Sequence, residues 1–319
     1  MRNLVVAAFL ALLGLGGVAF SQPYPGRPVR MLVGFPPGGG TDITARLLAP
    51  KLSEFLGQPF VVENRPGAAT NLATDVVAKA APDGYTLLFT TTALAINMSL
   101  YKNLPFDALR DFAPVSVFAE SPNLLVAHKS AGASVAELLS QARAKPGALN
   151  YSSAGSGTTQ HLAGEVFKLR SGTQIVHIPY KGTAASLTAV IAGEVQFSFA
   201  NVPAILGHVK NGRLRALAVA GPHRTDLMPE VPTMKEAGVE GVEVPVWYAL
   251  LAPAATPREV VAKLGEATAR ATRSSDTKQR LVEQGADPVG NTPEQFTKLL
   301  RAEVVKYAEI VRISGAKPE

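Results

Sequence analysis

Three short loops rich in glycine, serine and threonine stand out in this sequence, and each directly precedes a stretch of helical pattern. They cover residues 35–42, 153–159 and 180–183. The first N–H groups of a helix have no partner inside the helix and carry the positive end of its dipole. Glycine lets such a backbone come close to a ligand, so each loop could bind a carboxylate or a phosphate.

The first loop follows the apolar run Val29–Val33, so a strand enters the loop and a helix beginning near Asp42 leaves it. Asp42 stands four residues before Arg46, which is the spacing of an ion pair on one helix face. We therefore expect Asp42 to organise the loop and not to act as a catalytic acid. Lys181 is the only cation in the three loops, and it could either meet a ligand carboxylate or project into solvent.

Ordinary capping and turn formation could also explain any one of these loops, because every helix needs a cap. Three such loops in separate units of one chain favour a ligand site. Hydroxyl groups add further donors to the backbone N–H groups, on Thr41, Ser153, Ser156, Thr158 and Thr159. Two or more loops that face one cleft could bind a molecule with an acidic group at each end.

Motifs for nucleotide, metal or covalent chemistry are missing from the sequence. No Walker-type phosphate loop occurs, and Gly155-Ser156-Gly157 lacks the third glycine of a dinucleotide fingerprint. The same tripeptide differs from a hydrolase elbow, in which one residue separates the serine from each glycine. There is no cysteine, and the five histidines lie far apart, so we expect no metal and no cofactor. The alternative function is an exported α/β hydrolase in which His161 acts as the base for Ser156.

The elements that must position these loops alternate between short apolar strands and helical patterns, which is typical of α/β domains with crossover helices. Strands are predicted at Val29–Val33, Phe60–Glu63, Thr86–Phe89, Tyr151–Ser152, Gln174–Pro179, Val195–Phe199 and Leu214–Ala220. Helices are predicted at Asp42–Phe55, Asn71–Ala80, Val135–Ala144 and Ala184–Ala192. Pro50 lies inside the first predicted helix and should kink it or end it early. Capping boxes are predicted at Ser134, Thr256 and Thr292.

The chain is long enough for two domains and has two places where it could cross between them. One is the apolar run 115–128, which Ser121-Pro122 interrupts, and the other is 242–253. A chain that passes into a second α/β domain and returns would form a cleft between the two. Such clefts are favoured ligand sites.

The N-terminal segment has the anatomy of a secretory signal peptide. Arg2 is followed by an apolar stretch, and Ala19-Phe20-Ser21 predicts cleavage before Gln22. An uncleaved membrane anchor is the alternative, but the stretch only reaches the minimum length of a spanning helix and contains three glycines. We therefore expect an exported protein from which residues 1–21 are removed.

The charge balance favours small anionic solutes over nucleic acid as partners. The formal net charge is +6, but lysine and arginine are scattered, and aromatic residues make up only 7% of the chain. A nucleic-acid surface would gather basic residues into a patch and interleave them with aromatic rings. A hydrophobic content of 47% supports a buried core.

Further motifs run through the sequence in a fixed order. They are Tyr24-Pro25, Phe35–Asp42, Val62–Ala68, Ala81–Leu87, Ala95–Asn97, Pro179–Gly182, Gly212–Val219, Pro229–Thr233 and Glu236–Gly238. Each motif alone is loose, whereas their order and spacing together are specific. In this respect the sequence resembles the Bug-type extracytoplasmic solute receptors, the binding-protein component of tripartite tricarboxylate transporters, over nearly its whole mature length.

The resemblance implies a two-domain α/β fold of the type II periplasmic binding proteins, a Venus flytrap in which each domain is a mostly parallel sheet flanked by helices. Domain 1 would comprise residues 22–122 and 245–319, and domain 2 residues 123–244. It also implies a periplasmic receptor, not an enzyme, that captures a small di- or tricarboxylate between the domains. A membrane transporter would receive the acid. We expect a monomer that binds no nucleic acid.

In the family, one ligand carboxylate lies near the first loop, partly through bound waters, and the other end meets the loop of the second domain. Carried onto this sequence, the predicted ligand-binding residues are Phe35, Pro37, Gly38, Gly39, Gly40, Thr41, Asp42, Gly67, Ala68, Thr91, Ser153, Gly155, Ser156, Gly157, Thr158, Thr159, Tyr180, Lys181, Gly182, Thr183 and Ala200.

The sequence departs from the common pattern of the family at three places. Ala69-Thr70-Asn71 stands where many members have Gly-Gly-Asn, and Leu94 stands where many have a histidine. Ala200 replaces the aspartate of a Phe-Asp-Asn motif in the second domain. The loss of an aspartate that could meet a cationic or hydroxylated part of a ligand favours a less polar acid.

Overall fold

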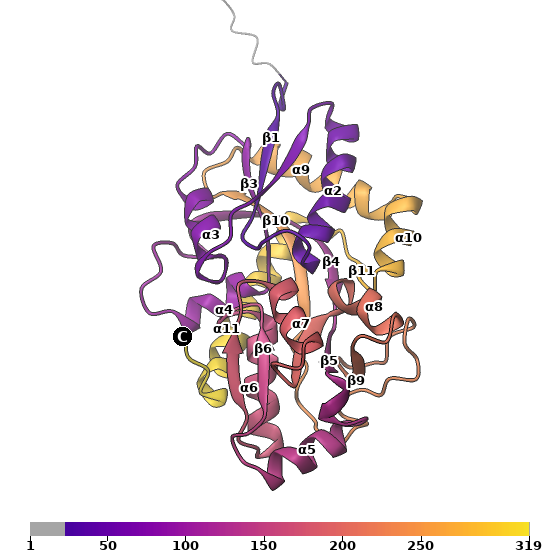
Figure 1. The fold of residues 1–319 in the computed structure, drawn as a ribbon. Coiled ribbons are helices and arrows are strands. Elements are labelled where there is room, and N and C mark those ends of the chain that lie inside the picture. Colours follow the sequence, from indigo (N-terminus) through magenta and orange to yellow (C-terminus); the bar gives the residue numbers. More distant parts are fainter. Residues whose placement is uncertain (1–22, 319) are drawn as a thin grey trace, which may run out of the picture.

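Two mixed sheets, each flanked by helices, form an upper and a lower unit in the computed structural model, which describes residues 23–318 (Figure 1). The predicted signal peptide lies outside the described residues. Within 23–318, every helix is too short or too polar to span a bilayer.

The first sheet has six strands in the order β11-β4-β10-β3-β1-β2. These strands are β1 (Val29–Val33), β2 (Phe60–Asn64), β3 (Thr86–Thr91), β4 (Phe112–Ser121), β10 (Val246–Pro253) and β11 (Asp287–Pro288). The helices of this unit are α2 (Gly40–Leu56), α3 (Asn71–Ala78), α4 (Ala93–Leu100), α9 (Arg258–Arg273), α10 (Ser275–Glu283) and α11 (Pro293–Ser314), with the 3-10 turn η1 (Ala68–Thr70).

The second sheet has five strands in the order β7-β6-β8-β5-β9. These strands are β5 (Asn123–Ala127), β6 (Asn150–Ser153), β7 (Val176–Pro179), β8 (Phe197–Asn201) and β9 (Arg215–Ala220). Its helices are α5 (Val135–Ala144), α6 (Thr159–Ser171), α7 (Thr183–Ile191) and α8 (Val202–Lys210), with the 3-10 turn η2 (Lys129–Ala131).

Both sheets contain more antiparallel pairing than the sequence suggested. β1 pairs in parallel with β2 and β3, but β10 runs antiparallel to both β3 and β4. In the second sheet β6 is parallel to β7 and β8, while β5 is antiparallel to β8 and β9. The crossing of the chain explains the antiparallel pair β4–β10, because one strand leads out of the first unit and the other returns to it.

The chain crosses between the units where the sequence predicted. β4 passes into β5 across Pro122, and β10 begins directly after the segment that returns from the second unit. The Asn123 side-chain amide donates a 2.7 Å hydrogen bond to the Val244 carbonyl, which ties the two crossings together. Helix α11 of the first unit also packs along α6 of the second (Figure 1).

Two local predictions about helix ends are wrong. Pro50 does not end α2 early, because the helix continues to Leu56. Pro50 and Arg46 both lie on the exposed face, so water can satisfy the carbonyl that the missing N–H leaves open, while Leu52 stays buried. The predicted box at Thr256 does not form, because α9 begins at Arg258 and Pro257 occupies the N-cap position.

Of the other two predicted capping boxes, the one at Thr292 forms completely, whereas only the Ser134 half of the other forms, because Glu137 Oε2 accepts from the Ala133 N–H and not from Ser134. The Ser134 side chain accepts a hydrogen bond from the Glu137 backbone N–H at the start of α5. Thr292 and Gln295 form a complete capping box at the start of α11. Both helices therefore begin where the sequence placed them, with donors of the first turn satisfied by side chains.

Candidate functional site

The three glycine-, serine- and threonine-rich loops meet in the cleft between the two sheets, where they open helices α2, α6 and α7. The cleft contains an outer cavity of about 390 Å³ and an inner cavity of about 20 Å³. Phe35 and Ala154 line both cavities and so separate them. The convergence of three helix starts on one place agrees with the geometry that the sequence predicted.

The inner cavity is lined by uncharged polar groups. Its lining within the described residues comprises Phe35, Thr41, Thr91, Ala154, Thr158, Thr159, Gln160, Thr183, Asn201 and Val246. Gln160 Nε2 donates to Thr183 Oγ1 at 2.9 Å, which joins α6 to α7. The side-chain oxygen of Asn201 is buried and has no hydrogen-bond partner. Five hydroxyl groups and two amides thus surround a space at the positive ends of three helices.

The first loop is organised by Asp42, as the sequence predicted. Its carboxylate is 4% exposed and accepts hydrogen bonds from the Gly38 N–H at 3.0 Å and from Asn64 Nδ2 at 2.9 Å. Arg46 Nε forms the expected ion pair at 3.0 Å. Burial alone would raise the pKa of Asp42, but the hydrogen bonds from Arg46, Gly38 and Asn64 outweigh it and hold the pKa below its ordinary value. The loop is therefore built around a charged carboxylate.

Gly40 allows the two units to approach each other closely at the start of α2. A Cβ atom on Gly40 would lie 2.2 Å from Asn201 Oδ1 and 2.9 Å from the Tyr248 hydroxyl oxygen. The Tyr248 hydroxyl is buried and has no hydrogen-bond partner. Glycine is therefore required here for contact across the cleft and not for an unusual backbone conformation, because Gly40 belongs to the helix.

The second loop uses most of its backbone N–H groups internally. Ala154 N–H donates to Gln160 Oε1, Gly155 N–H to Ser153 Oγ, and Gly157 N–H to His161 Nδ1. Thr158 N–H donates to the Gly155 carbonyl. These groups are consequently not available as ligand donors, although the sequence suggested that loop backbone would serve this purpose. The Thr158 hydroxyl is also engaged, because it donates to the Gly155 carbonyl at 2.8 Å. Thr159 lines the inner cavity and can offer its hydroxyl group.

The outer cavity is mostly apolar or backbone in character, with one charge at its wall. Its lining comprises Gly34, Phe35, Pro36, Pro66, Gly67, Ala68, Ala69, Thr70, Ala154, Gly155, Tyr180, Lys181 and Gly182. Lys181 is exposed, and it is the one charged residue among them. Across the cleft, a Cβ atom on Gly182 would lie 2.9 Å from the Pro36 ring. The loops 35–42 and 180–183 therefore close on each other above the inner cavity.

A left-handed turn forms one wall of the outer cavity. Ala68, Ala69 and Thr70 have φ angles of 45°, 51° and 78°, a region that disfavours residues other than glycine. Thr70 packs so closely on Gly34 that a Cβ there would lie 2.6 Å from the Thr70 Cβ. The Thr70 hydroxyl is buried without a hydrogen-bond partner. Backbone strain of this kind concentrates at ligand sites.

Several predicted residues do not line either cavity. These are Pro37, Gly38, Gly39, Gly40, Asp42, Ser153, Ser156, Gly157 and Ala200. Ala200 is fully buried in the apolar core of the second sheet, beside Leu124 and Val202, and its neighbour Asn201 reaches the inner cavity instead.

Sequence reasoning missed several wall residues, namely Gly34, Pro36, Pro66, Ala69, Thr70, Ala154, Gln160, Asn201 and Val246. Most of them adjoin a predicted residue, so extending each loop by one residue would have found them. Val246 gave no such signal, because it begins a strand that returns from the second unit.

The histidines near the second loop serve its structure. Ser153 Oγ and His177 Nε2 lie 2.7 Å apart, but Ser153 is fully buried and could not attack a substrate. His161 Nδ1 accepts the Gly157 N–H, so this nitrogen is occupied and cannot take a proton from Ser156 at the same time. No three His, Asp or Glu side chains within residues 23–318 gather in a way that could hold a metal ion.

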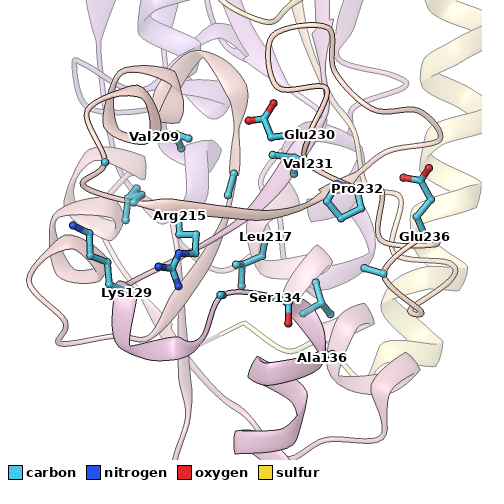
Figure 2. A pocket seen from close by; sticks show the side chains of 16 residues that line it. Lys129, Ser134, Ala136, Val209, Arg215, Leu217, Glu230, Val231, Pro232 and Glu236 are labelled. Carbon is cyan, nitrogen blue, oxygen red and sulfur yellow. The ribbon is translucent and has the colours of Figure 1, made fainter.

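A larger groove of about 770 Å³ lies elsewhere, beside β9 and α5 of the second unit (Figure 2). Figure 2 shows Lys129 and Arg215 on one side and Glu230 and Glu236 on the other. Arg215 is already bound to the Gly132 carbonyl at 2.9 Å. None of the groove's lining residues belongs to the three loops. We therefore place the candidate site in the smaller, interdomain cavities.

Comparisons with known proteins point to one family. A model described as the tripartite tricarboxylate transporter family receptor matches residues 44–315. Protein BugT of Bordetella pertussis is 38% identical over 316 residues, which cover 98% of this chain and 97% of BugT. A protein from the tcbD–tcbE intergenic region of a Pseudomonas strain is 36% identical, with 90% of this chain and 86% of that protein covered.

Solved structures give the same result. The structure of R. palustris Rpa4515 with adipate has a TM-score of 0.90 and 38% identity, and it covers 93% of this chain and 100% of that one. MatC from Rhodopseudomonas palustris with bound malate has a TM-score of 0.86 and 32% identity, with coverage of 90% and 100%. The arrangement of the two sheets is therefore shared with periplasmic solute receptors.

Proposed function

Because this chain belongs to the tripartite tricarboxylate transporter receptor family, we propose that it is a periplasmic receptor that captures a linear dicarboxylate in the cleft between its two sheets. The observation that carries the proposal is the convergence on the inner cavity of three helix starts and the hydroxyl groups of Thr41, Thr91, Thr159 and Thr183. Helix starts and hydroxyl groups supply hydrogen bonds and favourable dipoles to a carboxylate oxygen. Two of the similar structures hold dicarboxylates, adipate and malate.

The two cavities suggest how such an acid lies. The inner space of about 20 Å³ exceeds the roughly 10–15 Å³ that one water needs, so it suits a single carboxylate oxygen. The outer cavity of about 390 Å³ has the size of an ordinary small-molecule site and would hold the rest of the ligand. Its walls of Phe35, Pro36 and Pro66 suit a methylene chain. Lys181 would meet the second carboxylate at the mouth.

The domain division follows the two sheets. Residues 22–122 and 245–319 would form one domain and residues 123–244 the other, because every strand of each sheet falls within these ranges. Closure about the two crossings would trap the acid and present the closed surface to membrane transporter subunits. The receptor would act as a monomer in the periplasm after removal of residues 1–21.

The receptor would perform no chemistry on its ligand. Burial of Ser153 and the engagement of His161 Nδ1 with the Gly157 N–H support this part of the proposal. Turnover of an ester or amide that disappears in the His161→Ala variant would overturn it. Persistent acid binding without turnover in both proteins is the expected result.

A thermal-shift screen of the mature protein tests the ligand class, because specific binding raises the melting temperature with the logarithm of ligand excess. The panel comprises adipate, malate, citrate, benzoate, glutamate and the neutral diamide of adipate. We expect adipate to give the largest shift and the diamide none. An equal shift with the diamide, or no shift with any acid, would remove the basis for a carboxylate site.

The Lys181→Met variant tests whether Lys181 contacts the second carboxylate of the ligand. Because Lys181 is exposed, its loss should weaken adipate by no more than about fivefold. Binding of hexanoate, which has the same chain length and one carboxylate, should not change. Equal losses for both acids would mean that Lys181 does not meet the second carboxylate.

A further inference from the structure

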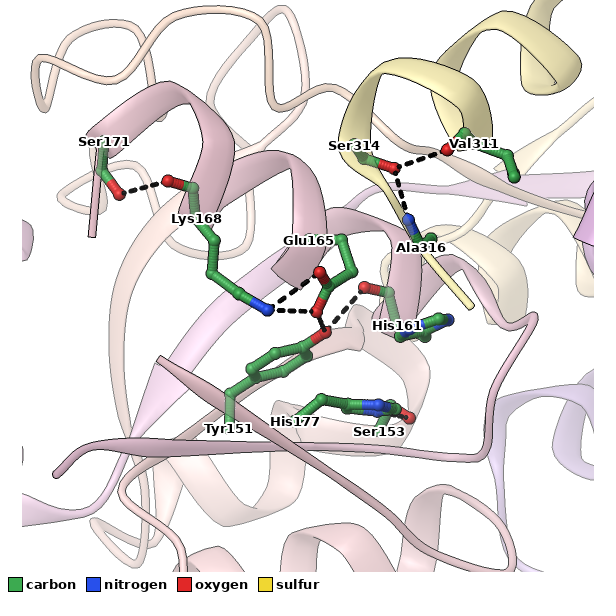
Figure 3. A network of polar contacts seen from close by, with 10 residues as sticks. All are labelled: Tyr151, Ser153, His161, Glu165, Lys168, Ser171, His177, Val311, Ser314 and Ala316. Carbon is green, nitrogen blue, oxygen red and sulfur yellow. Dashed lines mark hydrogen bonds and ion pairs between the residues drawn. The ribbon is translucent and has the colours of Figure 1, made fainter. Parts of the chain in front are cut away.

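A stack of aromatic rings lies directly behind the second loop (Figure 3). His161 on α6 and His177 on β7 stack with ring centroids 4.3 Å apart and an interplanar angle of 23°. Tyr151 on β6 also stacks with His177, with ring centroids 4.8 Å apart. The two histidines are only 2% and 7% exposed. They belong to neither cavity wall, so any effect on the ligand must pass through the loop.

The His161 ring is tied to the loop by a bond of known direction. Its Nδ1 atom accepts a hydrogen bond from the Gly157 N–H at 3.2 Å. A backbone N–H can only donate, so Nδ1 carries no proton, and a protonated imidazole could not make this bond. The backbone N–H of His161 in turn donates to Thr158 Oγ1, whose hydroxyl group lies at the inner cavity. His161 thus bonds to two successive residues of the loop, Gly157 and Thr158.

Gly157 is also the point at which the first unit touches the loop. A Cβ atom on Gly157 would lie 2.0 Å from Asn97 Oδ1, and the backbone there has a φ angle of +92°. The neighbouring Ser156 carbonyl accepts a hydrogen bond from the Tyr101 hydroxyl at 3.0 Å. A small displacement of Gly157 would therefore disturb both the cavity wall and the contact between the two units.

The charges around the ring pair act in opposite directions, because the Glu165 carboxylate favours a protonated His161 and the Lys168 ammonium disfavours it. On α6, Glu165 accepts hydrogen bonds from Lys168 at 2.8 Å and from the Tyr151 hydroxyl at 2.7 Å. From α11, which packs on α6, and from the segment that follows it, Figure 3 shows Val311, Ser314 and Ala316, and none of these titrates. Tyr101 is the titratable group that faces the loop from the first unit.

The pKa values of both histidines are depressed. Burial lowers the pKa of His161 to about 4, with Glu165 opposing and Lys168 adding to the shift. Burial, followed by the charges of His161 and Lys168, lowers the pKa of His177 to about 3. Both rings are therefore neutral at pH 7, and a positive charge on one ring disfavours a charge on the other.

We propose that His161 is a positioning residue of the ligand site, whose neutral ring holds Gly157 and so keeps the loop 153–159 in the conformation that lines the inner cavity. Protonation of the ring breaks the bond from Gly157 and releases the loop. The role of the loop in holding an acid rests on the proposed function. The link between the ring and Gly157 does not.

The test compares the mature wild-type protein with three variants. His161→Asn places a side-chain oxygen near the position of Nδ1 and keeps an acceptor, whereas His161→Leu removes it. His223→Asn changes an exposed histidine and is the control. The first readout is imidazole nitrogen NMR of the ligand-free wild type between pH 8 and 4. The second is hydrogen exchange of the Gly157 amide, and the third is adipate affinity at pH 7.

We expect His161 to carry its proton on Nε2 at pH 7 and to remain neutral down to about pH 5. The Gly157 amide should exchange roughly five- to tenfold faster in His161→Leu, the range for one lost hydrogen bond, and near the wild-type rate in His161→Asn and His223→Asn. Adipate affinity should follow the same order. The differential rescue by asparagine is the signature that a purely space-filling role would not produce.

His161 titrating between pH 6 and 7, or a Gly157 amide that exchanges equally in His161→Leu and wild type, would overturn the proposal. If His161→Leu fails to fold, the wild-type titration and the His161→Asn exchange rate still decide it. If wild type binds no acid of the screen, the proposed function fails, but the nitrogen spectra and the exchange rates still test the His161 role. Failure of the proposed function is thereby distinguished from failure of the His161 role.

Discussion

Asp42→Asn is expected to destabilise the folded protein much more than its conservative size suggests. The Asp42 carboxylate is 4% exposed and accepts from the Gly38 N–H, Asn64 Nδ2 and Arg46 Nε. An asparagine keeps one oxygen but turns the other acceptor into a donor, so one of these donors loses its partner. A hydrogen bond to a charged group contributes roughly 1.5–3 kcal/mol. With the weakened Arg46 pair, we expect a loss of about 2–4 kcal/mol in the free energy of unfolding.

Asp75→Asn is the matched control, because Asp75 also pairs with a basic residue four positions later on a helix. Its partner Lys79 is 62% exposed, and such surface pairs contribute at most about 0.5 kcal/mol. Urea unfolding at pH 7, followed by circular dichroism, gives both values under the same conditions. Equal losses for Asp42→Asn and Asp75→Asn would refute the reasoning that the loop is built on the Asp42 carboxylate.

Three further predictions follow from individual contacts. The pKa of His161 is about 4 in the folded protein and 6.5 ordinarily, so its contribution to the free energy of unfolding is complete above pH 6.5. Roughly 3 kcal/mol of this contribution is lost as the pH falls to 4. Urea unfolding of wild type and His161→Asn between pH 6.5 and 4 measures the loss. Tyr101→Phe removes the bond to the Ser156 carbonyl across the cleft and should weaken adipate about fivefold by calorimetry. Ala69→Gly should stabilise the protein by about 0.5–1 kcal/mol, because relief of the left-handed backbone outweighs the added entropy of the unfolded chain. Ala78→Gly in helix α3 should destabilise the protein, and thermal unfolding compares the two variants.

The strands and the three loops could be predicted because they depend on local pattern. β1, β3 and the ends of α5 follow from apolar runs and a capping serine, and neighbours in sequence decide them. The loop 35–42 is likewise local, since Asp42 bonds to Gly38 and Arg46 within a few residues. Family resemblance then brought the loops together in one cleft, which their spacing alone could not do.

The remaining site features could not be predicted because they depend on distant partners. Pro50 is tolerated in α2 because it faces solvent, and the local pattern does not fix that orientation. The sequence suggested His161 as a catalytic base for Ser156. In the structure His161 Nδ1 instead accepts a hydrogen bond from the Gly157 N–H, a role that arises from the fold of the loop around it. Asn201 reaches the inner cavity only because β8 extends two residues beyond its predicted end at Phe199.

The distribution of charge in the cleft suits a receptor that must release what it binds. A buried arginine would pair with a carboxylate through two strong charge-assisted bonds, and separating such a pair leaves an uncompensated charge. The inner cavity instead offers hydroxyl groups and helix starts, while Lys181, the cation of the outer cavity, stands at the exposed mouth. When the units separate, water can replace each of these neutral donors at little cost. Selection among different acids must then come from the shape of the outer cavity around Phe35 and Thr70. Part of this wall is the turn of residues 68–70, whose backbone has positive φ angles.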